Sequence, residues 1–196
     1  MEEMVMEFYR KVIFGKNYKG KGNISKIIEC CVTNAWNDMI AHTRNNPDKI
    51  VGDGANSEIK NKLINTIIKT IENNDCTFKF EKTLDLLNDE RLTLGQKQKF
   101  INMTFKYLYT FKDELRINKD KFKNCHCPID NKIKKNLIEE FNKSSKYVEN
   151  LIKLKSWSKL KDKTLYDAIQ TDLDLLVKDK HYSSKLELDF LFWNKG

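Results

Sequence analysis

The sequence predicts an all-α protein. Proline and glycine are rare, with two and seven among 196 residues, so signals for turns and strand ends are few. Lysine, leucine and isoleucine are abundant, and lysine and leucine are good helix formers. Because 40% of the residues are apolar, the chain can bury one modest core. We therefore expect a single compact helical domain over residues 1–196, with two lobes and an active-site cleft between them as the alternative.

Apolar residues recur at helical spacing along most of the chain, with short polar connections between the helices. Asn23 or Ser25 can cap the second predicted helix, and Ser57 the third. The final segment, residues 185–193, fits either a helix or a terminal strand. In order, the predicted helices cover residues 4–13, 24–44, 58–71, 78–87, 96–111, 131–142, 146–154 and 164–177.

Turn signals are concentrated in few places. Residues 45–58 contain one of the two prolines and two of the seven glycines, which predicts a loop. Residues 118–127 are the other soft connection. A strand pair near residues 77–80 is an alternative reading of that segment, although no hairpin turn accompanies it.

Charge and cysteine content restrict the partners and the compartment. Lysine plus arginine outnumber aspartate plus glutamate by 36 to 28, and the net charge of +8 favours an anionic partner such as nucleic acid. Only four basic residues are arginines and asparagine is abundant, so we attribute much of this excess to an AT-rich genome. No apolar stretch is long enough for a bilayer, the N-terminus is acidic, and the five cysteines include the adjacent Cys30 and Cys31. We expect a cytoplasmic protein with free thiols and no membrane partner.

A narrow polar stripe marks the apolar helix predicted after Gly95. Lys99, Asn102 and Lys106 are spaced i, i+3 and i+7, so they share one helix face. Taken alone, such a stripe is typical of a solvated face.

The second distinctive segment reads Cys125-His126-Cys127-Pro128-Ile129-Asp130. Asp130 stands where it would cap the helix that begins at residue 131. The adjacent Cys, His and Cys cannot easily all reach one tetrahedral ion, and no second cluster completes four ligands. We therefore expect no metal and no cofactor.

Together, the two segments resemble the helix-hairpin-helix DNA glycosylases, and in particular their archaeal 8-oxoguanine DNA glycosylase branch. That family has a catalytic lysine at the start of a buried helix and an aspartate after Pro-Ile or Pro-Val at the start of a later helix. Lys99 and Asp130, 31 positions apart (130 − 99), match these residues. The branch also has a second lysine seven residues after the first, which matches Lys106.

A terminal motif extends the resemblance, which covers about residues 94–132 and residues 189–193, roughly a quarter of the chain. The branch holds the flipped base with an aspartate and, four residues later, a tryptophan, matched here by Asp189 and Trp193. The resemblance thus implies Lys106, Asp189 and Trp193 as substrate-binding residues. Trp36 and Asn34 are guesses for its N-terminal base contacts.

The chain departs from the family at the hairpin. Leu92-Thr93-Leu94-Gly95 has one glycine where the family has two, so we expect a compact helical array of the glycosylase type with a degenerate hairpin. Lys97 is a rival nucleophile because it follows Gly95 by two residues, as in mainstream members. Only Lys99 has the partner seven residues later, so Lys99 is preferred.

These residue types suit base excision. Loss of a base leaves positive charge on the sugar, which the Asp130 carboxylate at a helix N-terminus would stabilise. Lys99 must be a neutral amine to attack, and we expect desolvation and the nearby Lys97 and Lys106 to favour that form. The expected protein is a monomeric DNA glycosylase and abasic-site (AP) lyase. It acts on DNA that contains a modified base, either in repair of oxidised guanine or in defence against phage with hypermodified bases.

Two alternatives come from other classes. The first is a non-catalytic basic helical module, nucleic-acid-binding or toxin-like, in which Lys99 and Lys106 line a phosphate-contacting face. The second is a helical protein-interaction domain whose charge reflects genome bias. Both a glycosylase and a nucleic-acid-binding module would need phosphate contacts. Lysines could supply them from the basic runs at residues 16–21, 119–123, 132–135 and 153–163.

Overall fold

The computed structural model describes residues 11, 24–41, 53–73 and 76–193, with the backbone alone for residues 53–57. Over these ranges all regular structure is helical and no strand occurs. The α-helices are α2 (Ile24–Ala41), α3 (Asp53–Glu72), α4 (Phe80–Leu86), α5 (Leu94–Thr110), α6 (Asn131–Phe141), α7 (Glu149–Lys153), α8 (Lys163–Asp179) and α9 (Lys185–Trp193). Two short 3-10 helices are η3 (Lys119–Phe122) and η4 (Trp157–Lys159).

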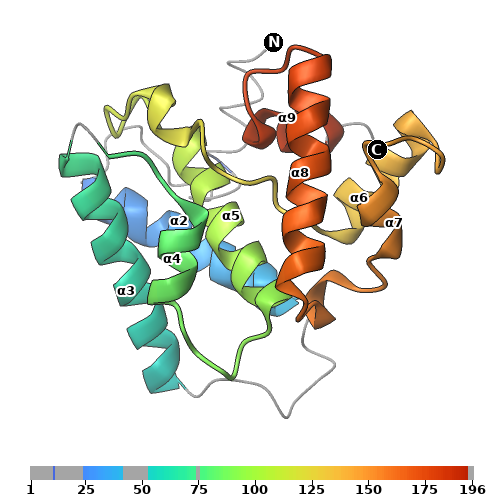
Figure 1. Cartoon of the computed structure of the whole chain (residues 1–196). Helices are drawn as coiled ribbons and strands as arrows, with labels where there is room; N and C mark the ends of the chain where they lie inside the picture. The colour runs from blue at the N-terminus through green and yellow to red at the C-terminus, as the bar shows by residue number, and fades with distance from the viewer. Residues whose placement is uncertain (1–10, 12–23, 42–52, 74–75, 194–196) are drawn as a thin grey trace.

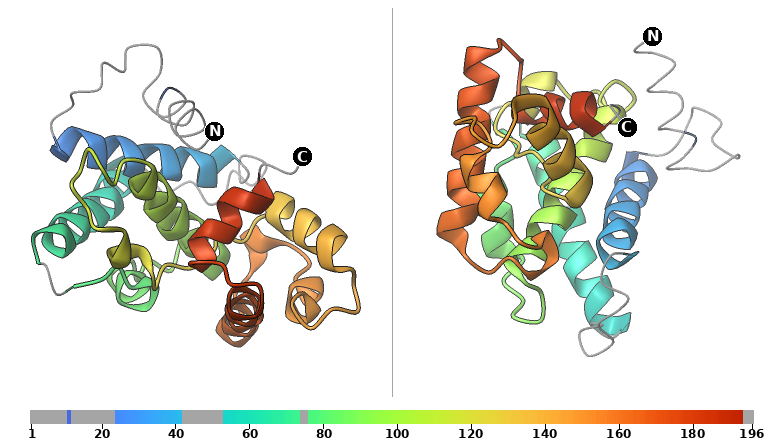
Figure 2. Two further views of the ribbon diagram at one scale, coloured as in Figure 1. Left: turned by 90° about the horizontal axis from the view of Figure 1, so that it is seen from above. Right: turned by 90° about the vertical axis from the view of Figure 1, so that its right-hand side faces the viewer.

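Helix α5 is the centre of the molecule. Helices α2 and α4 pack on it, and η3 and η4 contact it as well (Figure 1). Its buried apolar side chains include Phe100, Ile101, Phe105 and Leu108, so it is apolar on several sides. The later helices form a second group, in which α9 packs against α6 and α8, and α7 against α8 (Figure 2). Residues 111–130 connect the two groups.

The structure confirms the all-helical prediction and most of the helices. The final segment, left open between helix and strand, is helix α9, and the strand alternative near residues 77–80 is wrong. There Phe78 donates its N–H to the Lys121 carbonyl in a single bond of 2.9 Å instead of joining a ladder. The helix predicted over residues 4–13 and the Asn23 cap lie outside the described residues.

Two boundaries were predicted wrongly. Helix α3 begins at Asp53, within the predicted loop, and not after a cap at Ser57. Glycine is tolerated in a first helical turn, where the N–H groups have no intrahelical partner, so Gly54 does not prevent helix formation. Over residues 146–154, only Glu149–Lys153 form an α-helix.

The start of α5 is attached to η4. Thr93 caps the helix in a capping box, since its Oγ1 accepts the Gln96 N–H at 3.1 Å and its own N–H donates to Gln96 Oε1 at 2.8 Å. The Thr93 hydroxyl also donates to the Ser158 carbonyl, at 2.7 Å. Gly95 donates its N–H to the Leu160 carbonyl at 2.9 Å, and a Cβ on Gly95 would overlap the Trp157 carbonyl oxygen. The glycine is therefore required by a close backbone approach.

Replacing Gly95 with alanine is expected to lower the free energy of unfolding by about 1–3 kcal/mol, because the new methyl group meets a backbone atom that no rotamer change can move. Urea denaturation of the two proteins measures the difference. Lys97→Ala, in the same first turn, is the control and should change stability by less than about 0.5 kcal/mol. Equal effects of the two substitutions would contradict the close approach.

Candidate active site

Lys99 and Asp130 meet inside the protein. Lys99 projects from the second turn of α5, and Asp130 is the N-cap of α6, where its Oδ1 accepts the Ile133 N–H at 2.9 Å. The Lys99 ammonium forms an ion pair with Asp130 Oδ2 and lies 5.9 Å from the centre of the Trp157 ring. Lys99 is only 3% exposed. The expected buried-helix lysine and capping aspartate are thus in contact, with Lys99 and not Lys97 in the pair.

The charge balance around Asp130 keeps it ionised. Burial alone would raise the pKa of this carboxyl group. The Lys99 ammonium, through its charge and its hydrogen bond, and the Ile133 N–H outweigh burial, so the pKa of Asp130 lies below its ordinary value. Lys97 and Lys106 were expected to be the charges beside Lys99, but the charge in contact with Lys99 is the Asp130 carboxylate. Lys106 pairs with Asp189, and Lys97 is half-exposed.

A second ion pair lies two turns further along α5. Lys106 pairs with Asp189 of α9, and each residue is 1% exposed. Burial raises the pKa of Asp189 above its ordinary value, because the charges of Lys106 and Lys99 offset only part of the cost of removing this carboxylate from water. The polar stripe of α5 therefore faces inward, contrary to the solvated face that its pattern suggests when taken alone.

Trp193 lies beside this second pair. The Lys106 ammonium is 5.0 Å from the centre of the Trp193 ring and 5.2 Å from that of Phe190. On α6, Lys132 places its ammonium 4.1 Å from the same Trp193 ring. Hence the three residues predicted to hold a base, Lys106, Asp189 and Trp193, are neighbours in the structure.

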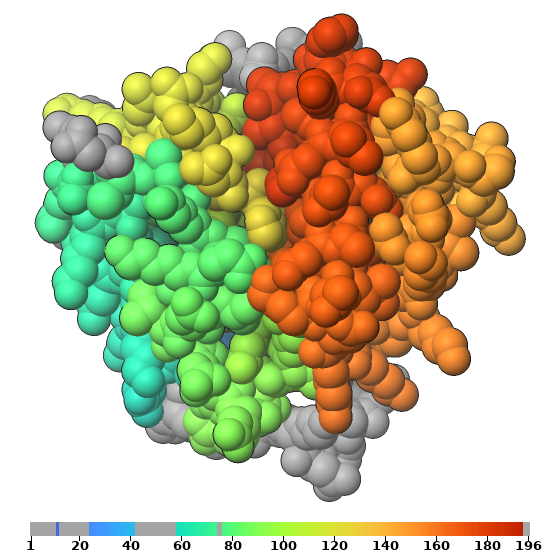
Figure 3. Space-filling model, in the orientation of Figure 1, coloured from blue at the N-terminus to red at the C-terminus, as the bar shows by residue number. Residues whose placement is uncertain are grey.

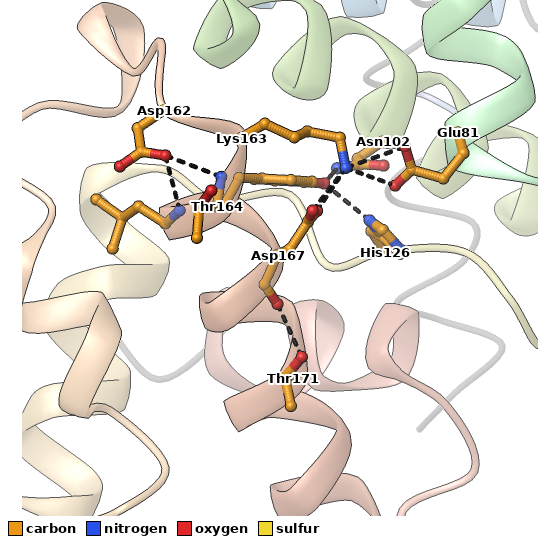
Figure 4. Close-up of polar contacts among 10 residues, drawn as sticks. Glu81, Asn102, His126, Asp162, Lys163, Thr164, Asp167 and Thr171 are labelled. Carbon is orange, nitrogen blue, oxygen red and sulfur yellow. Dashed lines mark hydrogen bonds and ion pairs between the residues drawn. The ribbon is translucent and has the colours of Figure 1, made fainter.

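Asn102, between the two lysines, begins a chain of buried hydrogen bonds that the sequence reasoning missed. Its Nδ2 donates to Gln98 Oε1 at 3.2 Å and to the Tyr166 hydroxyl at 3.1 Å. The Tyr166 hydroxyl lies 2.9 Å from His126 Nδ1 (Figure 4). Tyr166 is fully buried and also makes this polar contact. The only sequence signal was the i, i+4 spacing of Gln98 and Asn102, which extends the stripe by one turn.

The side chains of Cys125 and Cys127 are buried, and the His126 ring stacks on Phe80 and contacts Tyr166. Burial raises the pKa of both thiols, which disfavours the thiolates that bind metals. Burial and the charges of Lys185 and Lys163 lower the pKa of His126 to about 3, so its ring is neutral at neutral pH. Within the described ranges, no group of three or more His, Cys, Asp or Glu side chains is arranged to hold a metal ion.

Three backbone N–H groups at the start of α5 are already hydrogen-bonded within the protein. The N–H groups of Gly95, Gln96 and Lys97 donate to Leu160, Thr93 Oγ1 and the Thr93 carbonyl, respectively. The family's backbone grip on phosphates is therefore not available at these three positions.

Two lysines in the predicted phosphate-contacting runs are bonded to other parts of the protein. Lys121 is buried and donates to the carbonyls at the end of α3, those of Thr70, Asn73 and Cys76. Lys163 bridges Glu81 of α4, at 3.1 Å, and Asp167 of α8, at 2.6 Å (Figure 4). The run at residues 16–21 lies outside the described residues.

The two residues guessed as N-terminal base contacts, Trp36 and Asn34, both lie on α2. Trp36 is buried and packs edge-on against Phe100 with 5.1 Å between ring centres. Asn34 donates its side-chain amide to the Cys30 carbonyl one turn earlier, at 3.0 Å. Trp36 thus packs between α2 and α5, and Asn34 bonds within α2.

A hollow of about 290 Å³ lies elsewhere, between α3, α4 and residues 123–124 (Figure 3). Its lining includes Lys79, Lys82 and Lys123, together with the Phe78 and Phe105 rings. None of the predicted site residues lines it. The hollow therefore does not belong to the candidate active site.

No protein-family model, curated protein or solved structure matches the chain. None of the described helices has both the length and the apolar character needed to cross a bilayer.

Proposed function

We propose that the protein is a DNA glycosylase that excises a modified base and also cleaves abasic sites. The observation that carries the proposal is the buried contact between Lys99 and Asp130, a nucleophile and a carboxylate 31 residues apart on two different helices. The neighbouring Lys106, Asp189 and Trp193 supply polar groups and an aromatic surface for a base. The resemblance to the helix-hairpin-helix glycosylases explains why these five residues would act together.

In the proposed reaction, the glycosidic bond between C1′ and the base breaks, and the base leaves with the bonding electrons. The ionised Asp130 stabilises the positive charge that develops on the sugar. Lys99 gives up a proton, to Asp130 or to the departing base, and its Nζ forms a bond to C1′. Opening of the sugar ring yields a Schiff base, and loss of a proton from C2′ expels the 3′ phosphate and cuts the strand.

The burial of both lysines also bears on the alternatives. A module that contacts phosphates through Lys99 and Lys106 would hold them at its surface, yet each is 3% exposed or less and paired with an aspartate. We propose DNA with a modified base as the partner, oxidised or hypermodified. Oxidised guanine would indicate repair, and a hypermodified pyrimidine would indicate defence against phage.

Borohydride trapping tests the proposal. Wild-type protein is incubated with duplex and single-stranded oligonucleotides that carry an abasic site, 8-oxoguanine or a hydroxymethylated or glucosylated pyrimidine. Reduction should produce a covalent adduct, because it converts the Schiff base to a stable amine. Lys99→Gln should abolish the adduct, whereas Lys97→Gln, the matched control two residues earlier, should retain it.

Two results would overturn the assignment. If no oligonucleotide is trapped and no base is released, the protein is not a glycosylase with a lysine nucleophile. If trapping depends equally on both lysines or on neither, Lys99 is not the nucleophile. A salt-sensitive affinity for DNA without either reaction would support the non-catalytic binding module.

A further inference from the structure

Residues 125–130 lead into the candidate site without helical structure, and most of them are buried. Buried backbone N–H and C=O groups outside helices need partners, and here side chains of other helices provide them. From α8, Gln170 donates its side-chain amide to the Cys127 carbonyl at 3.0 Å, and Tyr166 contacts the His126 ring. From α5, Gln98 holds Ile129.

Gln98 contacts Ile129 at two points. Its Nε2 donates to the Ile129 carbonyl at 2.8 Å, and its Oε1 accepts the Ile129 N–H at 3.2 Å. Gln98 directly precedes Lys99 in the chain, and Ile129 directly precedes Asp130. Two consecutive residues of α5 thus contact two consecutive residues at the start of α6.

The hydrogen bonds around Gln98 have one consistent arrangement. Since Gln98 Oε1 accepts from Ile129, the atom of Asn102 that faces it must be the donor Nδ2. That same Nδ2 donates to the Tyr166 oxygen, so the Tyr166 hydrogen is free to bond to His126 Nδ1. The neutral His126 ring, beside Lys163 and Lys185, accepts it. This chain fixes the orientation of the Gln98 amide.

We propose that Gln98 is a positioning residue for the base-excision reaction: its two-point contact with Ile129 sets where the Asp130 carboxylate stands relative to Lys99. The inference rests on the proposed function. Asp130 must face both the sugar and the attacking amine, and a displacement of about 1 Å at a reacting group costs on the order of a hundredfold in rate.

A matched pair of variants tests this role. Gln98→Met and Gln170→Met each replace a buried glutamine by a side chain of similar shape. The first removes two hydrogen bonds to residues 125–130, and the second removes one. Both should lower the melting temperature. In single-turnover assays on the substrate found by trapping, Gln98→Met should slow base release about a hundredfold without a change in DNA Kd, and Gln170→Met by less than about fivefold.

The pH profile of base release distinguishes a positioning role from a purely structural one, because a loss of packing alone would leave the profile unchanged. In the wild type, the pKa of Asp130 is held down by Lys99, so base release should persist to acidic pH. In Gln98→Met, the carboxylate is no longer held against Lys99, and the acidic limb of the profile should shift to higher pH. Gln170→Met should retain the wild-type limb.

The outcomes separate this inference from the function on which it rests. If the wild type is active but both variants lose rate in proportion to their stability, with unchanged pH profiles, Gln98 is merely structural and the inference is wrong. If the wild type neither releases a base nor forms an adduct, the proposed function and this inference both fail.

Discussion

Asp130→Asn is expected to slow base release by about 100- to 1,000-fold, because the variant loses the negative charge that would stabilise the sugar cation. Asparagine is a good N-cap, so α6 should keep its first-turn hydrogen bond to Ile133. Trapping on a preformed abasic site should be much less affected, since the base has already gone and Lys99 is intact. Single-turnover base release and borohydride trapping measure the two steps separately.

Asp162→Asn is the matched control for this substitution. Asp162 also caps a helix, accepting the N–H groups of Thr164 and Leu165 at the start of α8, but it is exposed and contacts neither lysine of the site. Base release by this variant should equal that of the wild type. Equal losses in Asp130→Asn and Asp162→Asn would mean that capping, and not charge at the sugar, explains the effect.

Lys106→Met is expected to lower the free energy of unfolding by about 3–5 kcal/mol, because it leaves the Asp189 carboxylate buried without its partner. Asp189→Leu should also be destabilising, because it removes the carboxylate that pairs with the buried Lys106. The double variant should recover much of the loss, since replacement of a whole buried ion pair by apolar residues is often near neutral. Chemical denaturation of all four proteins gives the coupling energy.

The exposed pair between Lys146 and Asp179, at 2.7 Å, provides the control. Lys146→Met should cost less than about 1 kcal/mol, because water and salt screen an ion pair at the surface. Additive effects of Lys106→Met and Asp189→Leu would indicate that the two side chains do not interact in solution.

The spacing of apolar residues and the position of Asp130 were sufficient to predict α5, α6 and the Asp130 cap, because these features depend on residues close in sequence. It was not sufficient to predict which way the α5 stripe faces. Lys106 can be buried only because Asp189, 83 residues later, reaches it from α9, and helical periodicity contains no information about that partner. Only the resemblance to the glycosylases linked the two.

Contacts between side chains and distant backbone were equally invisible in the sequence. Lys121 reads as part of a solvated basic run, yet it caps the carbonyl end of α3. Gln98 reads as a polar residue at the edge of a helix, yet it binds the backbone of Ile129. Both depend on how an irregular segment crosses a helix, and such crossings leave no periodic signal.

The Lys99–Asp130 contact joins the α2–α5 group of helices to the α6–α9 group. Neither half of the chain contains the pair by itself, so the site is assembled only by folding that includes both. Any excursion that separates the halves must also break the Gln98–Ile129 and Asn102–Tyr166 contacts. In hydrogen-exchange terms, the Ile129 amide should therefore exchange only with the slowest amides of α5, through the same cooperative opening.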